Sequence, residues 1–136
     1  MGTLQLEIVT PEKVVVSQEV NMVVAPGTEG EFGILPEHIN FLSGILPGEV
    51  RFTYDKTSES MSVTTGFAEV SDNKVSILVE SAEKATDIDV GRAEAAEKRA
   101  KARLAIEDDQ EGIDFERAEL SLKRAITRIK VAKKSS

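Results

Sequence analysis

The side chains best placed for chemistry are four arginines in the last third of the chain. Arg92 and Arg99 are seven residues apart, two turns on one face of a helix, while Arg124 and Arg128 are four apart, one turn. Folding the chain back at Gln110 places Arg92 opposite Arg128, because each is 18 residues from that pivot. The same fold brings Arg124 to a level between Arg92 and Arg99. Four guanidinium groups would then line one groove, and their forked donors suit phosphate oxygens.

The same arginines also fit a simpler interpretation. Carboxylates at Glu94, Glu97 and Glu119 can pair with them on a solvated helix face. Most surface charges do no more than this. Spacing alone leaves both interpretations open.

Two other candidates point away from catalysis. The glycine-rich stretch Gly27–Gly33 has no Lys-Ser/Thr pair after it and opens no helix, so we expect a tight connection between strands rather than a phosphate loop. His38 is the only histidine, and Glu31 and Glu37 near it do not complete a metal site. We therefore expect no catalytic residue, no metal and no required cofactor. A nucleotide-processing enzyme is disfavoured because the groove has no metal pair or activated nucleophile.

Length and composition set the broad class. The 136 residues, 40% of them apolar, have room for a small domain with an appendage. The absence of cysteine fits a reducing compartment. The start of the chain lacks a basic segment followed by an apolar run, and no stretch approaches the roughly 18 apolar residues of a membrane span. These features predict a soluble, cytoplasmic protein.

The net charge of −7 hides an asymmetry along the chain. From Arg117 onward the tail is strongly basic, with Glu119 as its one carboxylate, whereas the first part is acidic. An acidic chain whose tail has no aromatic residue beyond Phe115 is not expected to bind nucleic acid. A basic helix near the end is better matched to an acidic protein surface or to phosphates.

Two helices must position the arginines. Apolar residues recur at helical spacing in two arms separated by the short acidic break Glu107–Gly112, which predicts antiparallel neighbours. Because alanine faces bury little area, at roughly 25 cal/mol per Å², we expect a marginally stable hairpin that acts as a movable arm. The apolar positions are Ala93, Ala96, Ala100 and Leu104 in the first arm, and Phe115, Ala118, Leu122, Ala125, Ile129 and Ala132 in the second.

The chain before Thr86 has the pattern of short strands. Alternating or β-branched segments between turn residues are typical of a sandwich or barrel. The composition then changes to Ala, Glu, Lys and Arg. Thr86 with Asp89 three positions on, or Asp87 or Asp89 itself, can cap the first helix, and Asp114 can cap the second. We predict an α+β chain of two domains, residues 1–86 and 87–136. The expected strands are 3–9, 14–16, 20–25, 50–54, 61–65, 67–70 and 74–79.

Several short segments, taken together and in order, resemble the epsilon subunit of bacterial F-type ATP synthase. The resemblance covers essentially the whole chain. The segments are Ile34–His38, Thr65–Val70, Lys74–Leu78, Ile88–Ala93, Phe115–Leu120 and Lys123–Ile126.

This resemblance implies a ten-stranded N-terminal β-sandwich followed by a C-terminal antiparallel α-helical hairpin. It implies a central-stalk rotor subunit that couples proton flow to ATP synthesis at the cytoplasmic face of the bacterial inner membrane, peripheral to the membrane through the complex. The sandwich would bind the gamma subunit and rest on the c-ring through a loop that includes Glu31 and His38. The hairpin would extend into the alpha/beta hexamer, meet acidic loops of the beta subunits and inhibit ATP hydrolysis.

Some bacterial members of that family bind ATP on the folded hairpin as a regulatory ligand. Ile88–Ala93 matches their motif, in which an Ile or Leu precedes Asp and Arg-Ala follows two residues later. Two positions depart from the family pattern: Gly91 weakens the first helical turn by about 1 kcal/mol relative to Ala, and Glu37 stands where glycine commonly precedes the histidine. The positions that the resemblance assigns to ATP are Glu83, Asp89, Arg92, Arg99, Arg124 and Arg128.

A second function class stays open at this point. The chain could be a β-sandwich adaptor whose basic hairpin binds a different acidic protein. Copurification with a gamma-like subunit would favour the stalk role over the adaptor.

Overall fold

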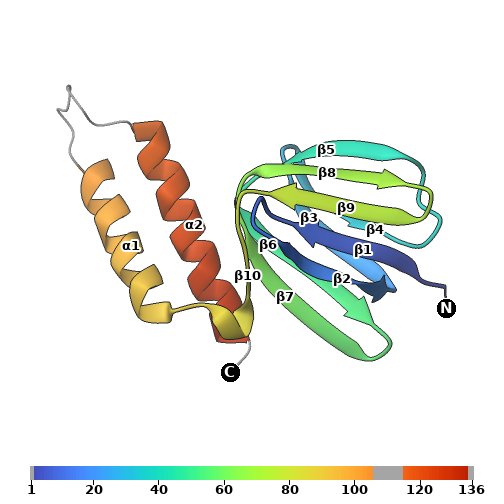
Figure 1. The fold of residues 1–136 in the computed structure, drawn as a ribbon. Coiled ribbons are helices and arrows are strands. Elements are labelled where there is room, and N and C mark those ends of the chain that lie inside the picture. The colour runs from blue at the N-terminus through green and yellow to red at the C-terminus, as the bar shows by residue number, and fades with distance from the viewer. Residues whose placement is uncertain (1, 106–114, 135–136) are drawn as a thin grey trace.

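The computed structural model describes residues 2–105 and 115–134, which form a β-sandwich followed by two helices (Figure 1). This arrangement confirms the predicted fold class. The ten strands are β1 Leu4–Val9, β2 Val14–Val20, β3 Met22–Gly27, β4 Gly30–Ile34, β5 Phe41–Ile45, β6 Gly48–Tyr54, β7 Thr57–Val63, β8 Gly66–Ser71, β9 Lys74–Val79 and β10 Ala82–Lys84. A short 3-10 helix, Ala85–Asp87, leads to α1 Val90–Leu104 and α2 Phe115–Lys134.

The strands form one hydrogen-bonded path that folds over on itself. Its order is β10-β7-β6-β3-β5-β8-β9-β1-β2, with β4 paired to β3. All neighbours are antiparallel except β1 and β9, which are parallel. Only Gly27 and Ile45 pair β3 with β5, and β2 returns to contact β6, so the path closes into two layers around one core.

The core is aliphatic and follows the alternation visible in the sequence. In β1 every second residue, Leu4, Leu6 and Ile8, is buried, because successive side chains of a strand point to opposite faces. Val23, Val50 and Ile77 enter the same cluster from other strands. The sandwich therefore has a core of its own, independent of the helices.

Several strand bounds differ from those expected. Val20 ends β2 instead of beginning the next strand, because Asn21 turns the chain: its Oδ1 accepts from the Asp55 backbone N–H at 2.6 Å and its Nδ2 donates to Gly2 O at 3.0 Å. β7 begins at Thr57 and ends at Val63, where residues 61–65 were expected. The glycine-rich stretch connects strands as predicted, although β4 occupies Gly30–Ile34 within it.

The two helices lie side by side as an antiparallel hairpin (Figure 1). Ala93 and Ala100 of α1 and Ala118 and Ala125 of α2 are each at most 2% exposed, so small side chains line the helix contact as the spacing predicts. The break Glu107–Gly112 and the expected cap at Asp114 lie outside the described residues. Within those residues, neither helix has the length and apolar character that crossing a bilayer requires.

Gly66 at the start of β8 is a position where the sandwich has no room for a side chain. A Cβ there would lie 1.9 Å from the carbonyl oxygen of Leu78 on the paired strand β9. We expect Gly66→Ala to lower the free energy of unfolding by about 1–3 kcal/mol, since overpacking forces the backbone to shift. Urea unfolding measures the change. Gly33→Ala in β4 is the control, because its nearest atom, Val23 O, is 4.0 Å away, and an equal loss in both variants would contradict the steric argument.

The loop after β4 holds Glu37 in the left-handed region, at φ 64°. The backbone N–H of Glu37 donates to Asn73 Oδ1 at 2.8 Å, so a side chain from the β8–β9 turn fixes this conformation. Glycine adopts it without a steric penalty.

We therefore expect Glu37→Gly to raise the free energy of unfolding by up to about 1 kcal/mol in urea titration. Glu37→Ala is the matched control, since it removes the carboxylate and keeps the Cβ. A gain of the same size in Glu37→Ala would assign the effect to charge and not to backbone strain.

Candidate functional site

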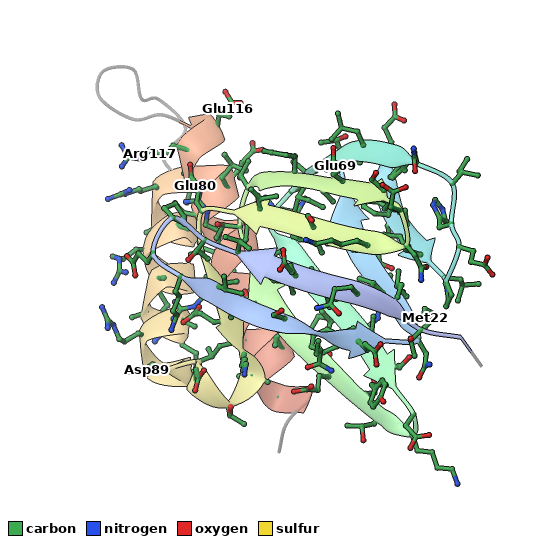
Figure 2. All side chains as sticks on the ribbon, turned by 45° about the vertical axis from the view of Figure 1, so that its right-hand side comes forward. Met22, Glu69, Glu80, Asp89, Glu116 and Arg117 are labelled. Atoms are coloured by element: carbon green, nitrogen blue, oxygen red, sulfur yellow. The ribbon has the colours of Figure 1, made fainter. Side chains whose placement is uncertain are left out.

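Asp89, one of the caps that the sequence allowed, is the N-cap of α1, which begins at Val90. The Asp89 carboxylate Oδ1 accepts a hydrogen bond from the Arg92 backbone N–H at 3.1 Å, which satisfies a free N–H of the first turn. Figure 2 places Asp89 at one end of the hairpin, with Glu116 and Arg117 at the other, where α2 begins. Asp89 thus positions the turn that carries Arg92.

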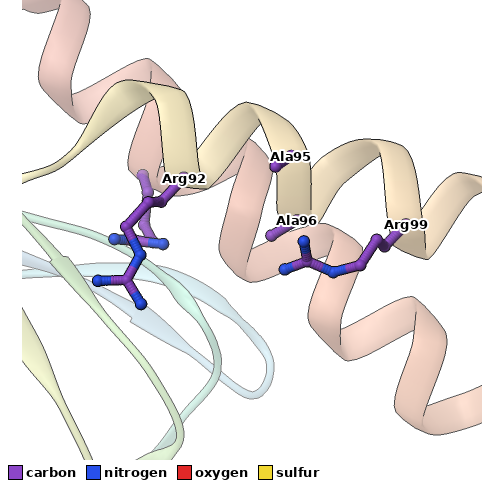
Figure 3. A pocket seen from close by; sticks show the side chains of 5 residues that line it. Arg92, Ala95, Ala96 and Arg99 are labelled. Carbon is purple, nitrogen blue, oxygen red and sulfur yellow. The ribbon is translucent and has the colours of Figure 1, made fainter.

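A hollow of about 390 Å³ lies along α1 on the side that carries the arginines (Figure 3). Its lining residues are Arg92, Ala95, Ala96 and Arg99 of α1 with Arg128 of α2. Among the described residues, no carboxylate lines it, and neither Arg92 nor Arg99 takes part in an ion pair. A concave surface with three guanidinium groups and small alanine walls suits a polyanionic ligand.

A second hollow of about 470 Å³ adjoins the first between α2 and the sandwich. The two share Ala96 and Arg128 as walls. Ser62, Thr64 and Ser81 bring hydroxyl groups to the sandwich side of the second hollow, and Glu83, Arg124 and Arg128 add charged groups. Its lining residues are Ser62, Thr64, Ser81, Glu83, Ala96, Ser121, Arg124, Ala125 and Arg128.

Glu83 and Arg128 form a bidentate ion pair across the boundary between the sandwich and the hairpin. Arg128 Nε donates to Glu83 Oε1 at 2.7 Å and a terminal nitrogen donates to Oε2 at 3.2 Å. Both side chains are about one third exposed or less, at 33% and 25%. Such a pair fixes α2 against β10 and also holds one arginine of the first hollow.

Arg124 is the least satisfied of the four arginines. Its Nε is buried and has no hydrogen-bond partner among the described residues. A buried donor left unpaired costs about 1–3 kcal/mol. An acceptor in the second hollow would relieve that cost.

The structure brings together most of the predicted ATP-binding residues. Arg92 and Arg128 share a hollow with Arg99, as folding about Gln110 predicted, while Arg124 and Glu83 lie around the adjoining one. Asp89 lines neither hollow. Whether these residues bind ATP stays a prediction.

The solvated-face interpretation fits only part of this arrangement. Arg128 pairs with Glu83 of the sandwich and not with a helix carboxylate, and Glu97 pairs with Lys101 at 3.6 Å.

The predicted c-ring residues lie in two different settings. Glu31 of β4 accepts two hydrogen bonds from Arg51, at 3.0 and 3.2 Å, and this lowers the pKa of its carboxyl group, with a smaller contribution from Lys130. His38 follows β4, where its Nδ1 donates to Ile39 O at 2.7 Å and its ring packs edge-on to Phe41. No hydrogen bond joins Glu31 to His38 in the described part of the chain.

Two exposed apolar surfaces lie on the sandwich. One surrounds His38 and includes Leu35 and Ile39, which are 58% and 78% exposed. The other crosses the outer face of β5, β8 and β9, where Leu42, Phe67 and Leu78 share one face by register. Exposed apolar groups gathered in this way mark interaction surfaces.

Sequence reasoning missed a charged cluster beside β4. Arg51 of β6 also donates to Glu49 Oε1 at 3.1 Å, and Glu49 is only 5% exposed although it is a carboxylate. Residues 49 and 51 share one face of a strand because side chains alternate. That spacing was the available signal, but it does not reveal burial.

Family models match almost the entire chain. Residues 3–85 match the ATP synthase delta/epsilon chain β-sandwich domain. Residues 86–133 match the long α-helix domain of the same chains.

Curated relatives are similar over about three fifths of the chain. The ATP synthase epsilon chain of Nitratidesulfovibrio vulgaris strain DP4 is 54% identical over 85 residues, covering 62% of this chain and 63% of that one. That of Syntrophobacter fumaroxidans is 51% identical over 82 residues, covering 60% and 61%. The chain thus matches less than two thirds of the length of these relatives.

Solved structures share the fold at low sequence identity. A chain of the Euglena gracilis mitochondrial ATP synthase, in an OSCP/F1/c-ring assembly, has a TM-score of 0.81 at 22% identity, covering 93% of this chain and 79% of its own. A chain of the Tetrahymena thermophila mitochondrial ATP synthase central stalk and c-ring has a TM-score of 0.55 at 16% identity, covering 96% and 94%. With both of its domains matched in order by the family models, the chain belongs to the family of ATP synthase delta/epsilon chains.

Proposed function

We propose that this chain is a non-catalytic rotor subunit in the central stalk of a proton-translocating F-type ATP synthase. The support is the match of both domains to the delta/epsilon family, in order and over residues 3–133. In this role the chain sits at the cytoplasmic face of the bacterial inner membrane, held there by the complex. The adaptor alternative has no comparable observation in its favour.

The two exposed apolar surfaces fit the two partners of a stalk subunit. The outer face of β5, β8 and β9 exposes Leu42, Phe67 and Leu78 side by side, and this apolar face suits docking of the gamma subunit. The loop with Leu35, His38 and Ile39 follows the end of β4 and suits the c-ring, whereas Glu31 lies near the start of β4, beside Arg51. Burial of these apolar side chains supplies the binding free energy, at roughly 25 cal/mol per Å².

The hairpin is suited to leave the sandwich and enter the alpha/beta hexamer. Its apolar attachment is a small cluster of Ile88, Val131 and Ala132 with Ala85, separate from the sandwich core. Basic residues on α2 suit acidic loops of the beta subunits. The released hairpin would inhibit ATP hydrolysis.

ATP is the proposed ligand of the arginine hollow. The observation that carries this assignment is the convergence of Arg92, Arg99 and Arg128 on one hollow without a lining carboxylate. Because this hollow forms only when α1 and α2 are paired, with Arg128 also held by the sandwich, ATP would favour the folded hairpin by its differential affinity. Loss of ATP would favour release and inhibition.

We expect calorimetry to detect ATP binding to the purified chain and Arg92→Ala to weaken it about tenfold or more, because one charge-assisted contact to phosphate is lost. Arg103→Ala is the control, since Arg103 is also exposed on α1 but does not line the hollow. No measurable heat with the unaltered chain would remove the nucleotide assignment. An equal loss of affinity in both variants would mean that ATP responds only to the net charge of the chain.

We expect Phe67→Glu to reduce copurification of the gamma subunit several-fold, because the substitution places a charge at the centre of the β5, β8 and β9 face. Val14→Glu on β2 is the matched control, since Val14 is exposed to a similar extent, 56% against 48%, on another strand. Quantified pull-down from coexpressed subunits measures the effect. If the Phe67→Glu variant still copurifies with the gamma subunit, the β5, β8 and β9 face is not the docking face.

A further inference from the structure

A series of charged side chains, Glu31, Arg51, Glu49 and Lys130, connects strand β4 of the sandwich to the hairpin, outside the proposed ATP site. We propose that it couples docking of α2 to the state of Glu31 on β4, so that a contact made at Glu31 changes how firmly the hairpin is held. This inference rests on the proposed function in one respect, that the hairpin can leave the sandwich.

The distances make the cluster continuous. Arg51 lies between Glu31, at 3.0 Å, and Glu49, at 3.1 Å. Lys130 of α2 approaches the same Glu49 oxygen at 4.0 Å. One arginine is therefore shared by two carboxylates, and one of these carboxylates also faces a cation that belongs to the hairpin.

Burial makes Glu49 the sensitive member. Its side chain is 4% exposed, while the side chains of Glu31 and Lys130 are 52% and 62% exposed. A buried carboxylate depends on nearby cations because water does not compensate its charge. When α2 departs, Lys130 departs with it and Glu49 depends more on Arg51.

The sharing of Arg51 sets the direction of the coupling. While Glu31 holds Arg51 through two hydrogen bonds, Glu49 gains more from Lys130 and the docked hairpin is favoured. When Glu31 is neutralised or binds another group, Arg51 interacts with Glu49 alone. Glu49 then gains less from Lys130, so the docked hairpin is held less firmly. By reciprocity, release of the hairpin draws Arg51 away from Glu31.

The same region offers a matched control. A hollow of about 290 Å³ beside the cluster is lined by Glu31 and Glu49 of the sandwich and by Lys123 and Lys130 of α2. Among the described residues, Lys123 makes no ion pair with either carboxylate. It therefore matches Lys130 in charge and location but not in contact.

Thiol accessibility can measure docking because the chain contains no cysteine. Ser62 of β7 is 5% exposed and lines the hollow under α2, so alkylation of a Ser62→Cys variant requires the hairpin to leave. A Ser58→Cys variant on the exposed part of the same strand gives the intrinsic alkylation rate. The ratio of the two rates gives the undocking equilibrium in the full chain.

In the Ser62→Cys background without nucleotide, we expect Glu31→Gln and Lys130→Met each to raise the alkylation rate about two- to fivefold, as expected for partly exposed charge pairs. Lys123→Met should leave the rate nearly unchanged. With Arg51→Met, the effect of Glu31→Gln should fall to less than half, because the shared side chain is gone. Arg51→Lys is the second variant if Arg51→Met does not fold.

An unchanged rate in Glu31→Gln would overturn the inference. A Glu31→Gln effect that persists fully in both Arg51→Met and Arg51→Lys would also overturn it, and so would equal effects of Lys123→Met and Lys130→Met. Either result would mean that the alkylation rate reports only the overall electrostatic field of the protein. Failure of ATP to slow alkylation, with the Glu31 effect intact, would count against the ATP assignment alone. Absence of alkylation in every variant would overturn the movable hairpin and the coupling with it.

Discussion

The attachment of α2 to the sandwich combines one bidentate ion pair, between Glu83 and Arg128, with a small buried apolar cluster. The two hydrogen bonds, at 2.7 and 3.2 Å, join α2 to β10, the strand that leads into the helical part of the chain. The apolar cluster beside them contains one isoleucine, one valine and alanines. A partly exposed pair with so little apolar support holds the hairpin in place without fixing it there.

Within the hairpin the balance of forces is different. Ala93, Ala100, Ala118 and Ala125 are almost fully buried, so the backbones of α1 and α2 approach closely along their shared length. This contact does not involve the sandwich core, which is complete without it. A ligand between the two helices would stabilise their pairing, while Arg128 ties the pair to β10.

Local patterns predicted both helices and most strands but not β4, β5 or β10, and contacts distant in sequence decided the rest. Buried faces could be identified from the alternation of Leu4, Leu6 and Ile8 and from the spacing of the alanines, because the period of a strand or a helix decides which residues share a face. β4 escaped detection because its residues are mostly exposed and two are glycine. The burial of Glu49 was also not predicted, because the residues next to it in the sequence do not indicate that α2, some 80 residues later, covers it. Helix geometry predicted that Arg92, Arg99 and Arg128 come together, but it placed Arg124 in the same groove, whereas Arg124 lines the second hollow, where α2 meets the sandwich.

The basic character of α2 links the docked hairpin to its proposed inhibitory role. Arg128 and Lys130 use their charges on carboxylates of this chain, Glu83 and Glu49, when the hairpin is folded. The same side chains would be available to acidic loops of a beta subunit only after these pairs separate. In the proposed role, docking of the hairpin on the sandwich and binding to a beta subunit would therefore compete for the same cations. An anion at Arg128 and a contact at Glu31 would each bias that competition from a different side of α2.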